Sequence, residues 1–288
     1  MGNSDTHNTG FSGRINTVYG WINYTVNHRS HNSYFCWTLL LSKSYNMNSI
    51  LNNDCLKQMK KMKTGMFDVV VTSPPYNLNN STGSGMKLGS RGSALWPNSS
   101  LRRDGYQDYK DNMPQDEYVA WQKDCLAEML RLIKPTGAIF YNHKWRTQNG
   151  LIQDRQDIVG DFPVRQIIIW SRGNGFNFND GYFLPTYEVI YLICGKEFKL
   201  KPKANTIGDV WRISPELNTE HPAPFPVELV DKILTSCPGN LVLDPFFGSG
   251  TVGVSAVKNG WQYVGIEKSQ EYCQMADERI KNQTKPLL

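Results

Sequence analysis

The chain has 288 residues, with 31 Lys and Arg against 26 Asp and Glu, which gives a formal net charge of +5 and a pI near 8.8. An apolar content of 40%, with 24 Gly and 15 Pro, excludes a low-complexity chain and predicts a globular protein with one large core. No apolar stretch approaches the roughly 20 residues of a membrane span, so we expect no membrane partner, and the mild positive charge permits nucleic acid without requiring it.

The first 46 residues differ from the rest of the chain. They are rich in Asn, Ser, Tyr and Trp, contain Asp5 as their only acid, and show neither a heptad nor a clean alternation. We interpret residues 1–46 as an irregular N-terminal extension and residues 47–288 as the main domain. The opening Met-Gly-Asn-Ser-Asp-Thr fits a myristoylation pattern, but a pattern this short is common by chance.

A buried strand is predicted over 67–72, where an apolar, β-branched run ends at Ser73-Pro74-Pro75-Tyr76. Residues 79–111 are rich in Gly, Ser, Asn and Arg with little periodicity, which is typical of a long functional or disordered loop. A helix is expected over 115–133, and residues 134–137 should end it. The apolar face of this helix comprises Tyr118, Trp121, Cys125, Met129 and Leu132.

The rest of the chain alternates between strands and helices. The expected strands are 138–141, 165–170, 187–193, 241–243 and 263–266, and the expected helices are 226–235, 252–259 and 270–281. A Gly- and Asn-rich turn at about 171–183 separates the second and third of these strands. This alternation predicts an α/β fold with a mostly parallel twisted sheet and helices on both faces.

The cysteines are scattered, and no Cys-x-x-Cys pair occurs among Cys36, Cys55, Cys125, Cys194, Cys237 and Cys273. Their spacing argues against a zinc site or a disulfide framework, so we expect no metal and a reducing compartment. The predicted location is therefore the cytoplasm, or the nucleus in a eukaryote.

A glycine turn follows the strand expected at 241–243, with the sequence Asp244-Pro245-Phe246-Phe247-Gly248-Ser249-Gly250-Thr251. Glycines at a strand-to-helix turn let the backbone approach a ligand, and the start of the next helix offers N–H groups. Glu267 ends the following strand, where a carboxylate can accept hydrogen bonds from both hydroxyls of a ribose. The turn lacks both the Gly-x-Gly-x-x-Gly of dinucleotide sites and the lysine of a P-loop, so the pattern favours a nucleoside cofactor.

A second turn, Thr72-Ser73-Pro74-Pro75-Tyr76-Asn77, ends the strand at 67–72. Its prolines remove two backbone donors, which leaves carbonyl groups that can face a ligand. The Pro74 carbonyl and the Ser73 hydroxyl can accept hydrogen bonds from an amino group, and Tyr76 can stack on a planar base. For Pro-Pro taken alone, a turn that merely ends a strand is the alternative interpretation.

In this order, the two turns resemble the β-class of S-adenosylmethionine-dependent DNA amino-methyltransferases, in which the catalytic motif precedes the cofactor motif. The resemblance covers roughly residues 48–282 and implies a Rossmann-like methyltransferase fold with a circularly permuted motif order. Three further segments resemble that family, namely 53–56 at the cofactor adenine, 132–137 before a strand and 221–226 near the methionine end. Phe225 departs from the family pattern, because a lysine is common there.

The resemblance implies S-adenosylmethionine as the cofactor and assigns roles to individual positions. It assigns catalysis to Ser73, Pro74, Pro75 and Tyr76. It assigns cofactor binding to Asp54, Cys55, His221, Asp244, Phe246, Gly248, Ser249, Gly250, Thr251 and Glu267.

Double-stranded DNA is the implied partner, and a homodimer is expected from the resemblance alone. The candidate DNA contacts are Asn77, Arg91, Arg102, Arg103, Lys110, Lys144, Arg146 and Arg172. Because no long separate target-recognition segment is evident, the loop at 79–112, the turn at 171–183, or both must read the DNA.

The implied reaction is direct methyl transfer from a sulfonium to the exocyclic nitrogen of a flipped-out base. Hydrogen bonds to Ser73 and to the Pro74 carbonyl would favour a more tetrahedral, nucleophilic nitrogen. Serine at the first position of the motif is typical of cytosine-N4 enzymes and aspartate of adenine-N6 enzymes, so cytosine N4 is favoured and adenine N6 is the alternative. The pattern argues against a cytosine-C5 enzyme, because Cys237-Pro238 has the reverse order of the Pro-Cys nucleophile.

Two further classes stay open at this point. RNA- or glutamine-directed methyltransferases with a similar motif usually place the cofactor glycines first, which is the reverse of the order here. A nucleic-acid-binding protein that keeps the fold without catalysis would bind S-adenosylmethionine and transfer no methyl group to DNA.

Overall fold

The computed structural model describes residues 11–17, 20–26, 46–77, 113–148, 150–173, 180–216 and 225–283. Contacts divide the chain into two units, Met1–Ser44 and Tyr45–Leu288. The loop predicted at 79–112 and the centre of the turn predicted at 171–183 lie outside the described residues. Among the helices in the described ranges, none is long and apolar enough to cross a membrane.

The first unit contains an antiparallel hairpin of β1 (Phe11–Thr17) and β2 (Gly20–Val26). The last pair of the hairpin is Thr17 with Gly20. This hairpin occupies part of the segment 1–46 that the sequence predicts as an irregular extension. Pairing within one hairpin does not require the clean apolar alternation that the sequence lacks.

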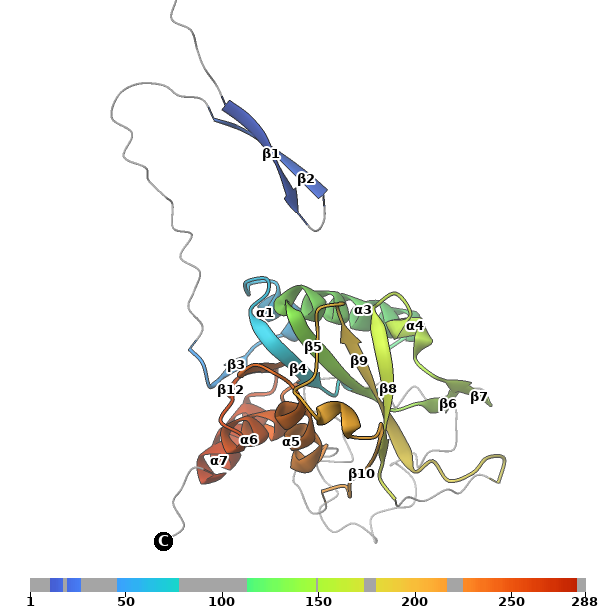
Figure 1. Cartoon of the computed structure of the whole chain (residues 1–288). Helices are drawn as coiled ribbons and strands as arrows, with labels where there is room; N and C mark the ends of the chain where they lie inside the picture. Colours follow the sequence, from blue (N-terminus) through green and yellow to red (C-terminus); the bar gives the residue numbers. More distant parts are fainter. Residues whose placement is uncertain are drawn as a thin grey trace, which may run out of the picture. The chain divides into compact units, whose positions relative to one another are not determined.

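Within the described residues, the second unit is built around an eight-stranded sheet in the order β10-β8-β9-β5-β4-β11-β12-β3 (Figure 1). The strands are β3 (Ser49–Asn52), β4 (Phe67–Thr72), β5 (Ile133–His143), β8 (Val164–Ser171), β9 (Tyr187–Cys194), β10 (Val210–Arg212), β11 (Leu241–Asp244) and β12 (Gln262–Glu267). All neighbouring pairs are parallel except those of β9, which runs antiparallel to both β5 and β8. The predicted α/β fold with a mostly parallel sheet is confirmed.

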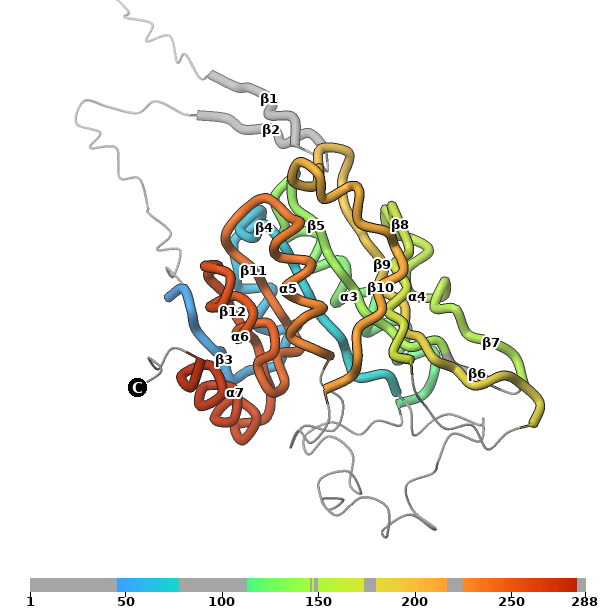
Figure 2. The backbone as a smooth tube through the Cα atoms, turned by 60° about the horizontal axis from the view of Figure 1, so that its bottom comes forward, coloured from blue at the N-terminus to red at the C-terminus, as the bar shows by residue number. Residues whose placement is uncertain are grey.

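Helices cover both faces of this sheet (Figures 1 and 2). One face carries α1 (Cys55–Met59), α3 (Gln115–Leu132) and α4 (Gln156–Val159), and the other carries α5 (Val227–Ser236), α6 (Thr251–Lys258) and α7 (Gln270–Gln283). Successive side chains of a strand point to opposite faces, so Val69 and Val71 join the core under α5, α6 and α7, while Val70 joins the core under α1 and α3. The sheet is buried on both sides, as is usual for parallel strands.

Several short elements are not predicted from the sequence. They are β3, α4, β10, the hairpin of β6 (Arg146–Gln148) and β7 (Leu151–Gln153), and the 3₁₀ turn η2 (Ala204–Thr206). Each is at most five residues long. Elements of this length are too short to show a helical or strand period.

Strand β5 begins directly after α3, at Ile133, whereas the sequence predicts a break at 134–137. The pairing of β5 with β4 shifts its register in this region, and such an irregularity tolerates the missing N–H of Pro135. Gly137 is required there, because a Cβ would lie 2.7 Å from the Asp68 carbonyl oxygen. Lys-Pro-Thr-Gly therefore forms an irregular strand start and not a turn.

Candidate active site

The two turns identified in the sequence meet at one edge of the sheet. Strands β4 and β11 are parallel neighbours, so Thr72 and Asp244 end at the same edge. The Thr72 hydroxyl donates a hydrogen bond of 2.7 Å to Asp244 Oδ1. The topology thus joins a turn that offers amino-group acceptors to a glycine turn suited to a nucleoside, at the strand ends where open α/β sheets bind ligands.

Asp244 holds the start of the glycine turn and is 1% exposed. Besides the bond from Thr72, its Oδ1 accepts the N–H of Phe246 at 3.0 Å. Burial raises the pKa of the Asp244 carboxyl from 3.8 to about 7, because desolvation outweighs these two hydrogen bonds to the charged form. In this structure the buried Asp244 carboxyl therefore holds the glycine turn in place through its hydrogen bonds.

The raised pKa of Asp244 predicts a pH dependence of stability. Since the folded chain binds this proton more tightly than the unfolded chain, the folded state loses stability as the pH rises from about 4 to about 7. Asp244→Asn keeps an acceptor oxygen and cannot ionise. We therefore expect its free energy of unfolding, relative to wild type, to rise by an amount on the order of a few kcal/mol between about pH 4 and pH 8.

Thermal and urea unfolding across this pH range measure the difference between Asp244→Asn and wild type. Asp209→Asn removes a carboxylate at an exposed position and is the control for the loss of a side-chain charge. A difference that does not change with pH for Asp244→Asn would show that Asp244 does not titrate in this range.

Glu267 ends β12 and faces the glycine turn. Its carboxylate oxygens accept the backbone N–H groups of Gly248 and Ser269, each at 2.8 Å. These bonds fix the orientation of a half-buried carboxylate whose oxygens can each accept more than one hydrogen bond. Phe246, in the same glycine turn, is half-buried, and its ring centroid lies 5.6 Å from that of Trp121 in an edge-to-face arrangement. A fixed carboxylate and an aromatic surface at a glycine turn fit a nucleoside cofactor.

Ser249 and Thr251 are tied to helix α7. Arg279 Nη1 donates to Thr251 Oγ1 at 3.0 Å and to Ser249 Oγ at 3.3 Å. Gly250 between them has a φ of +80°, and a Cβ there would lie 2.8 Å from a side-chain carbon of that helix. The two hydroxyls, predicted to bind the cofactor, therefore brace the turn in this structure.

Segment 53–55 lies next to Glu267, because the Asn53 N–H donates to the Glu267 carbonyl oxygen at 3.0 Å. Asp54 caps helix α1 by accepting the N–H of Lys57 at 2.9 Å. Cys55 is buried in the core under that helix. The structure thus brings this predicted segment to the edge of the sheet that carries the glycine turn. The Asp54 and Cys55 side chains themselves contact other parts of the protein, as a helix cap and as a core residue.

The Pro-Pro turn places its hydroxyl groups in a polar cluster, formed by Ser73, Tyr76, Asn142 and Glu188. Ser73 Oγ lies 2.7 Å from the Tyr76 hydroxyl oxygen. Asn142 Nδ2, near the end of β5, donates to the Tyr76 oxygen at 2.7 Å and to Ser73 Oγ at 3.3 Å. Glu188 Oε2, at the beginning of β9, accepts from the Tyr76 hydroxyl and from Asn142 Nδ2, each at 3.0 Å.

Asn142 and Glu188 are missed by the sequence analysis, although each leaves a signal. Asn142 directly follows the apolar run of a predicted strand, at the end where ligands bind. Glu188 is the single acid of an otherwise apolar strand, and buried carboxylates are rare. Neither signal says that the two side chains meet, because that depends on the antiparallel pairing of β9 with β5.

Two predicted DNA contacts lie at the same edge. Arg172 follows β8, and its Nη1 lies 3.5 Å from Glu188 Oε1. Lys144 follows β5, and its pKa is lowered by burial and by the positive charge of Arg172, which the Glu188 carboxylate opposes. The structure thus brings these two cations to the side of the sheet that carries the polar cluster.

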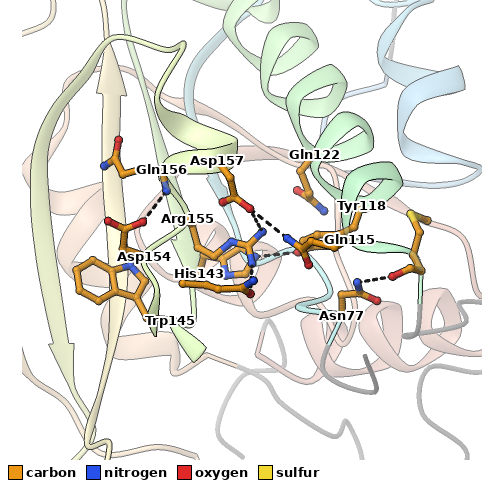
Figure 3. A network of polar contacts seen from close by, with 12 residues as sticks. Asn77, Gln115, Tyr118, Gln122, His143, Trp145, Asp154, Arg155, Gln156 and Asp157 are labelled. Atoms are coloured by element: carbon orange, nitrogen blue, oxygen red, sulfur yellow. Dashed lines mark hydrogen bonds and ion pairs between the residues drawn. The ribbon is translucent and has the colours of Figure 1, made fainter. Parts of the chain in front are cut away.

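A second network contains Tyr118, His143 and Arg155 (Figure 3), and its first two residues contact the Pro-Pro turn. The Tyr118 hydroxyl donates to the Pro75 carbonyl at 2.7 Å and lies 2.8 Å from His143 Nε2. The ring of His143 packs on that of Tyr76, with centroids 4.8 Å apart. Arg155 is fully buried, and its guanidinium carbon lies 5.5 Å from the centre of the Tyr118 ring. Through these contacts Tyr118 fixes both a carbonyl and, by way of His143, the ring of the turn.

Tyr118→Phe removes only the hydroxyl that joins this network. We expect the variant to lose about 1–3 kcal/mol in free energy of unfolding, because the carbonyl of the half-buried Pro75 loses its donor. Urea unfolding measures this change. Tyr263→Phe, on the other face of the sheet, is the matched control and should differ little from wild type. Equal losses in the two variants would argue against a special role for the Tyr118 hydroxyl.

The remaining predicted site residues divide into two groups. Asn77 is fully buried with a φ of +57°, and its Nδ2 donates to the Met113 carbonyl at 2.8 Å, so in this structure it closes the turn and presents no surface to DNA. Outside the described residues lie His221, Arg91, Arg102, Arg103 and Lys110, and the Arg146 side chain is likewise not described. In the described ranges, no group of three or more His, Cys, Asp or Glu could hold a metal ion.

Comparison with known proteins agrees with this geometry. A DNA methylase family model, which covers enzymes that modify N6 or N4 amino groups, matches residues 67–278. Type II methyltransferase M.BglII of Bacillus subtilis is 25% identical over 80% of this chain and 68% of its own length. Type II methyltransferase M.HinfI of Haemophilus influenzae is 28% identical over 82% of this chain and 68% of its own length.

Solved structures share the fold. The PvuII DNA methyltransferase, named cytosine-N4-specific, gives a TM-score of 0.60 at 18% identity, covering 80% of this chain and 85% of that one. A DNA modification methylase of Thermus thermophilus, in complex with S-adenosyl-L-methionine, gives 0.57 at 20% identity, covering 83% and 95%. The chain therefore belongs to the N6/N4 DNA methylase family, a class of DNA amino-methyltransferases, and S-adenosylmethionine is its cofactor. The resemblance seen in the sequence is confirmed.

Proposed function

We propose that this chain is a site-specific DNA methyltransferase that modifies the N4 amino group of a flipped-out cytosine. The observation that carries the proposal is the place of Ser73, at the first position of the Pro-Pro turn and in the polar cluster beside the glycine turn. Serine there is typical of cytosine-N4 enzymes. The cytosine-N4-specific PvuII enzyme has the same fold, which supports the proposal at the level of architecture.

Catalysis in this proposal is positioning. Bound S-adenosylmethionine supplies the methyl group on a sulfonium. Ser73 Oγ and the Pro74 carbonyl accept the two amino hydrogens, and Tyr76, whose ring packs on His143, gives the base a stacking surface. Holding the nitrogen in line with the methyl group can lower the barrier by several kcal/mol, and no residue needs to form a covalent bond.

Glu267 and the glycine turn hold the cofactor. We assign the ribose hydroxyls to the Glu267 carboxylate and the base to the surface of Phe246. Backbone groups of the glycine turn face the methionine end, while Asp244, Ser249 and Thr251 keep the turn in shape. The cofactor turn and the Pro-Pro turn follow neighbouring strands, so the two substrates meet at one edge.

Adenine N6 is the second candidate, and the Glu188 carboxylate is the observation that favours it. Adenine-type enzymes carry an aspartate at the first motif position, and Glu188 brings a carboxylate into the same cluster as Ser73. The two acceptors at the turn would serve the amino group of either base.

The setting of the enzyme is also part of the proposal. Lys144 and Arg172 contact DNA phosphates, and the loop at 79–112 reads the sequence. The names of the relatives support a role in restriction-modification. A cytoplasmic location is proposed together with that role. A homodimer is proposed by analogy with β-class enzymes. Light scattering, which measures the mass of the protein in solution, tests this proposal.

The product base decides between the candidates. The chain is expressed in a host that lacks DNA methylation, the DNA is digested to nucleosides, and methylated bases are measured by mass spectrometry. We expect N4-methylcytosine, and much less of it with Ser73→Ala or Tyr76→Ala. Detection of N6-methyladenine would support methylation of a DNA amino group and contradict the assignment of cytosine as the target base. The absence of both methylated bases, with cofactor binding intact, would contradict DNA methylation.

A further inference from the structure

Glu188 is a nearly buried carboxylate, and burying a carboxylate costs free energy unless other groups compensate for the lost water. It is 8% exposed, in a strand whose other residues are mostly buried and apolar. Because β9 runs antiparallel to its neighbours, the beginning of β9 lies at the same edge as the ends of β4 and β5. A buried charge is tolerated only when hydrogen bonds and a counter-charge compensate for lost water.

The partners of Glu188 meet that requirement and include the Pro-Pro turn. Its Oε2 accepts from the Tyr76 hydroxyl and from Asn142 Nδ2, each at 3.0 Å. Its Oε1 lies 3.5 Å from Arg172 Nη1, which supplies the counter-charge. The Asn142 amide is oriented by the same contact, because the reversed amide would set its oxygen against the carboxylate.

These contacts fix the direction of the hydrogen bonds in the polar cluster. An ionised carboxylate only accepts, and a phenol has a single proton. When the Tyr76 proton points to Glu188, the 2.7 Å contact between Tyr76 and Ser73 must take its proton from Ser73. Asn142 Nδ2 donates to the same Tyr76 oxygen, which agrees with an oxygen that accepts at this contact.

We propose that Glu188 is a positioning residue that acts through Tyr76 to make Ser73 a pure hydrogen-bond acceptor. The only proton of Ser73 is used toward Tyr76, so its oxygen presents lone pairs alone to the amino group of the target base. A serine that pointed its proton at the amino group would set two donors against each other. The inference rests on the proposed role of Ser73 and holds for a cytosine or an adenine amino group.

Two substitutions separate the acceptor role of Glu188 from its charge. Glu188→Gln removes the charge and keeps a carbonyl oxygen that can accept from Tyr76, whereas Glu188→Met has a similar length and no such acceptor. We expect Glu188→Met to lower the single-turnover rate of methyl transfer by about 10- to 100-fold, and Glu188→Gln by no more than about 3-fold. The dissociation constants for S-adenosylmethionine and DNA should stay the same in both.

The control is Glu197→Met, at an exposed position just after β9, which should match wild type. Equal losses for Glu188→Gln and Glu188→Met would show that pairing with Arg172 matters instead, and an active Glu188→Met would overturn the proposal outright. Because the effect passes through the Tyr76 hydroxyl, Glu188→Met should cost nothing further in a Tyr76→Phe background. Multiplicative losses would contradict that route.

Neutron diffraction of the wild-type protein tests the inference without relying on activity. We expect the Tyr76 deuterium to point at Glu188 and the Ser73 deuterium at Tyr76. A Tyr76 deuterium that points at Ser73 would overturn the proposal, whatever the enzyme methylates. Absence of methylated DNA with the expected deuterium positions would instead count against the proposed function.

Discussion

Ser73→Ala should lower the single-turnover rate of methyl transfer to DNA by about 10²- to 10³-fold, while the dissociation constant for S-adenosylmethionine stays the same. The amino group of the base loses an acceptor that is fixed in place by the 2.7 Å contact with Tyr76 and the 3.3 Å contact with Asn142. An acceptor in a preorganised cluster stabilises the developing charge on nitrogen without reorganising during the reaction. Water could replace the lost oxygen only with poorer geometry.

The experiment uses rapid mixing of the enzyme–cofactor complex with excess target DNA. Ser236→Ala is the matched control, because its hydroxyl bonds a helix carbonyl within α5, and it should react at the wild-type rate. If Ser73→Ala reacted within a few-fold of the wild-type rate, Ser73 would not contribute to catalysis. Weaker cofactor binding in Ser73→Ala would point to a role in shaping the cofactor turn.

The parts of the site that follow from the sequence are those that depend on local patterns. The run at 67–72, the glycine turn and the strand that ends at Glu267 each combine a buried strand with a change of residue type at its end. Parallel neighbours then carry these ends to one edge, which general rules for α/β sheets anticipate. For this reason the fold class itself implies that the two turns lie at one edge of the sheet, where Thr72 bonds Asp244.

Asn142 and Glu188 show what local patterns leave out. Their contact depends on the antiparallel direction of β9 and on its register with β5, in which Asn142 pairs with Ile190. A shift of one residue would turn Glu188 to the other face of the sheet. Long-range register of this kind is decided by packing across the whole sheet, so the sequence of neither strand predicts it.

Resemblance to a family also says little about how a position is used. Asp54, Ser249 and Thr251 match positions assigned to the cofactor, but their side chains cap a helix or bond Arg279. A position can serve a ligand through its backbone while its side chain holds the loop in shape. Only the hydrogen-bond partners distinguish the two cases.

Glu267→Ala should weaken S-adenosylmethionine binding by about 100-fold, which corresponds to about 2.7 kcal/mol. The substitution removes the carboxylate that we assign to the ribose hydroxyls. It also leaves the N–H groups of Gly248 and Ser269 without their 2.8 Å acceptor, which loosens the turn around the cofactor. Titration calorimetry measures the affinity, and Glu271→Ala, at an exposed position in α7, is the matched control.

A cofactor analogue that lacks the ribose hydroxyls separates these two effects. Wild-type protein should bind the analogue less tightly than S-adenosylmethionine, because the carboxylate loses both donors. Glu267→Ala should bind the two ligands almost equally, since the group that distinguishes them is gone, while any loosening of the turn lowers both affinities together. If the variant still preferred S-adenosylmethionine as strongly as wild type does, the ribose hydroxyls would have to be held by another group, and Glu267 would be left with the structural task of fixing Gly248 and Ser269.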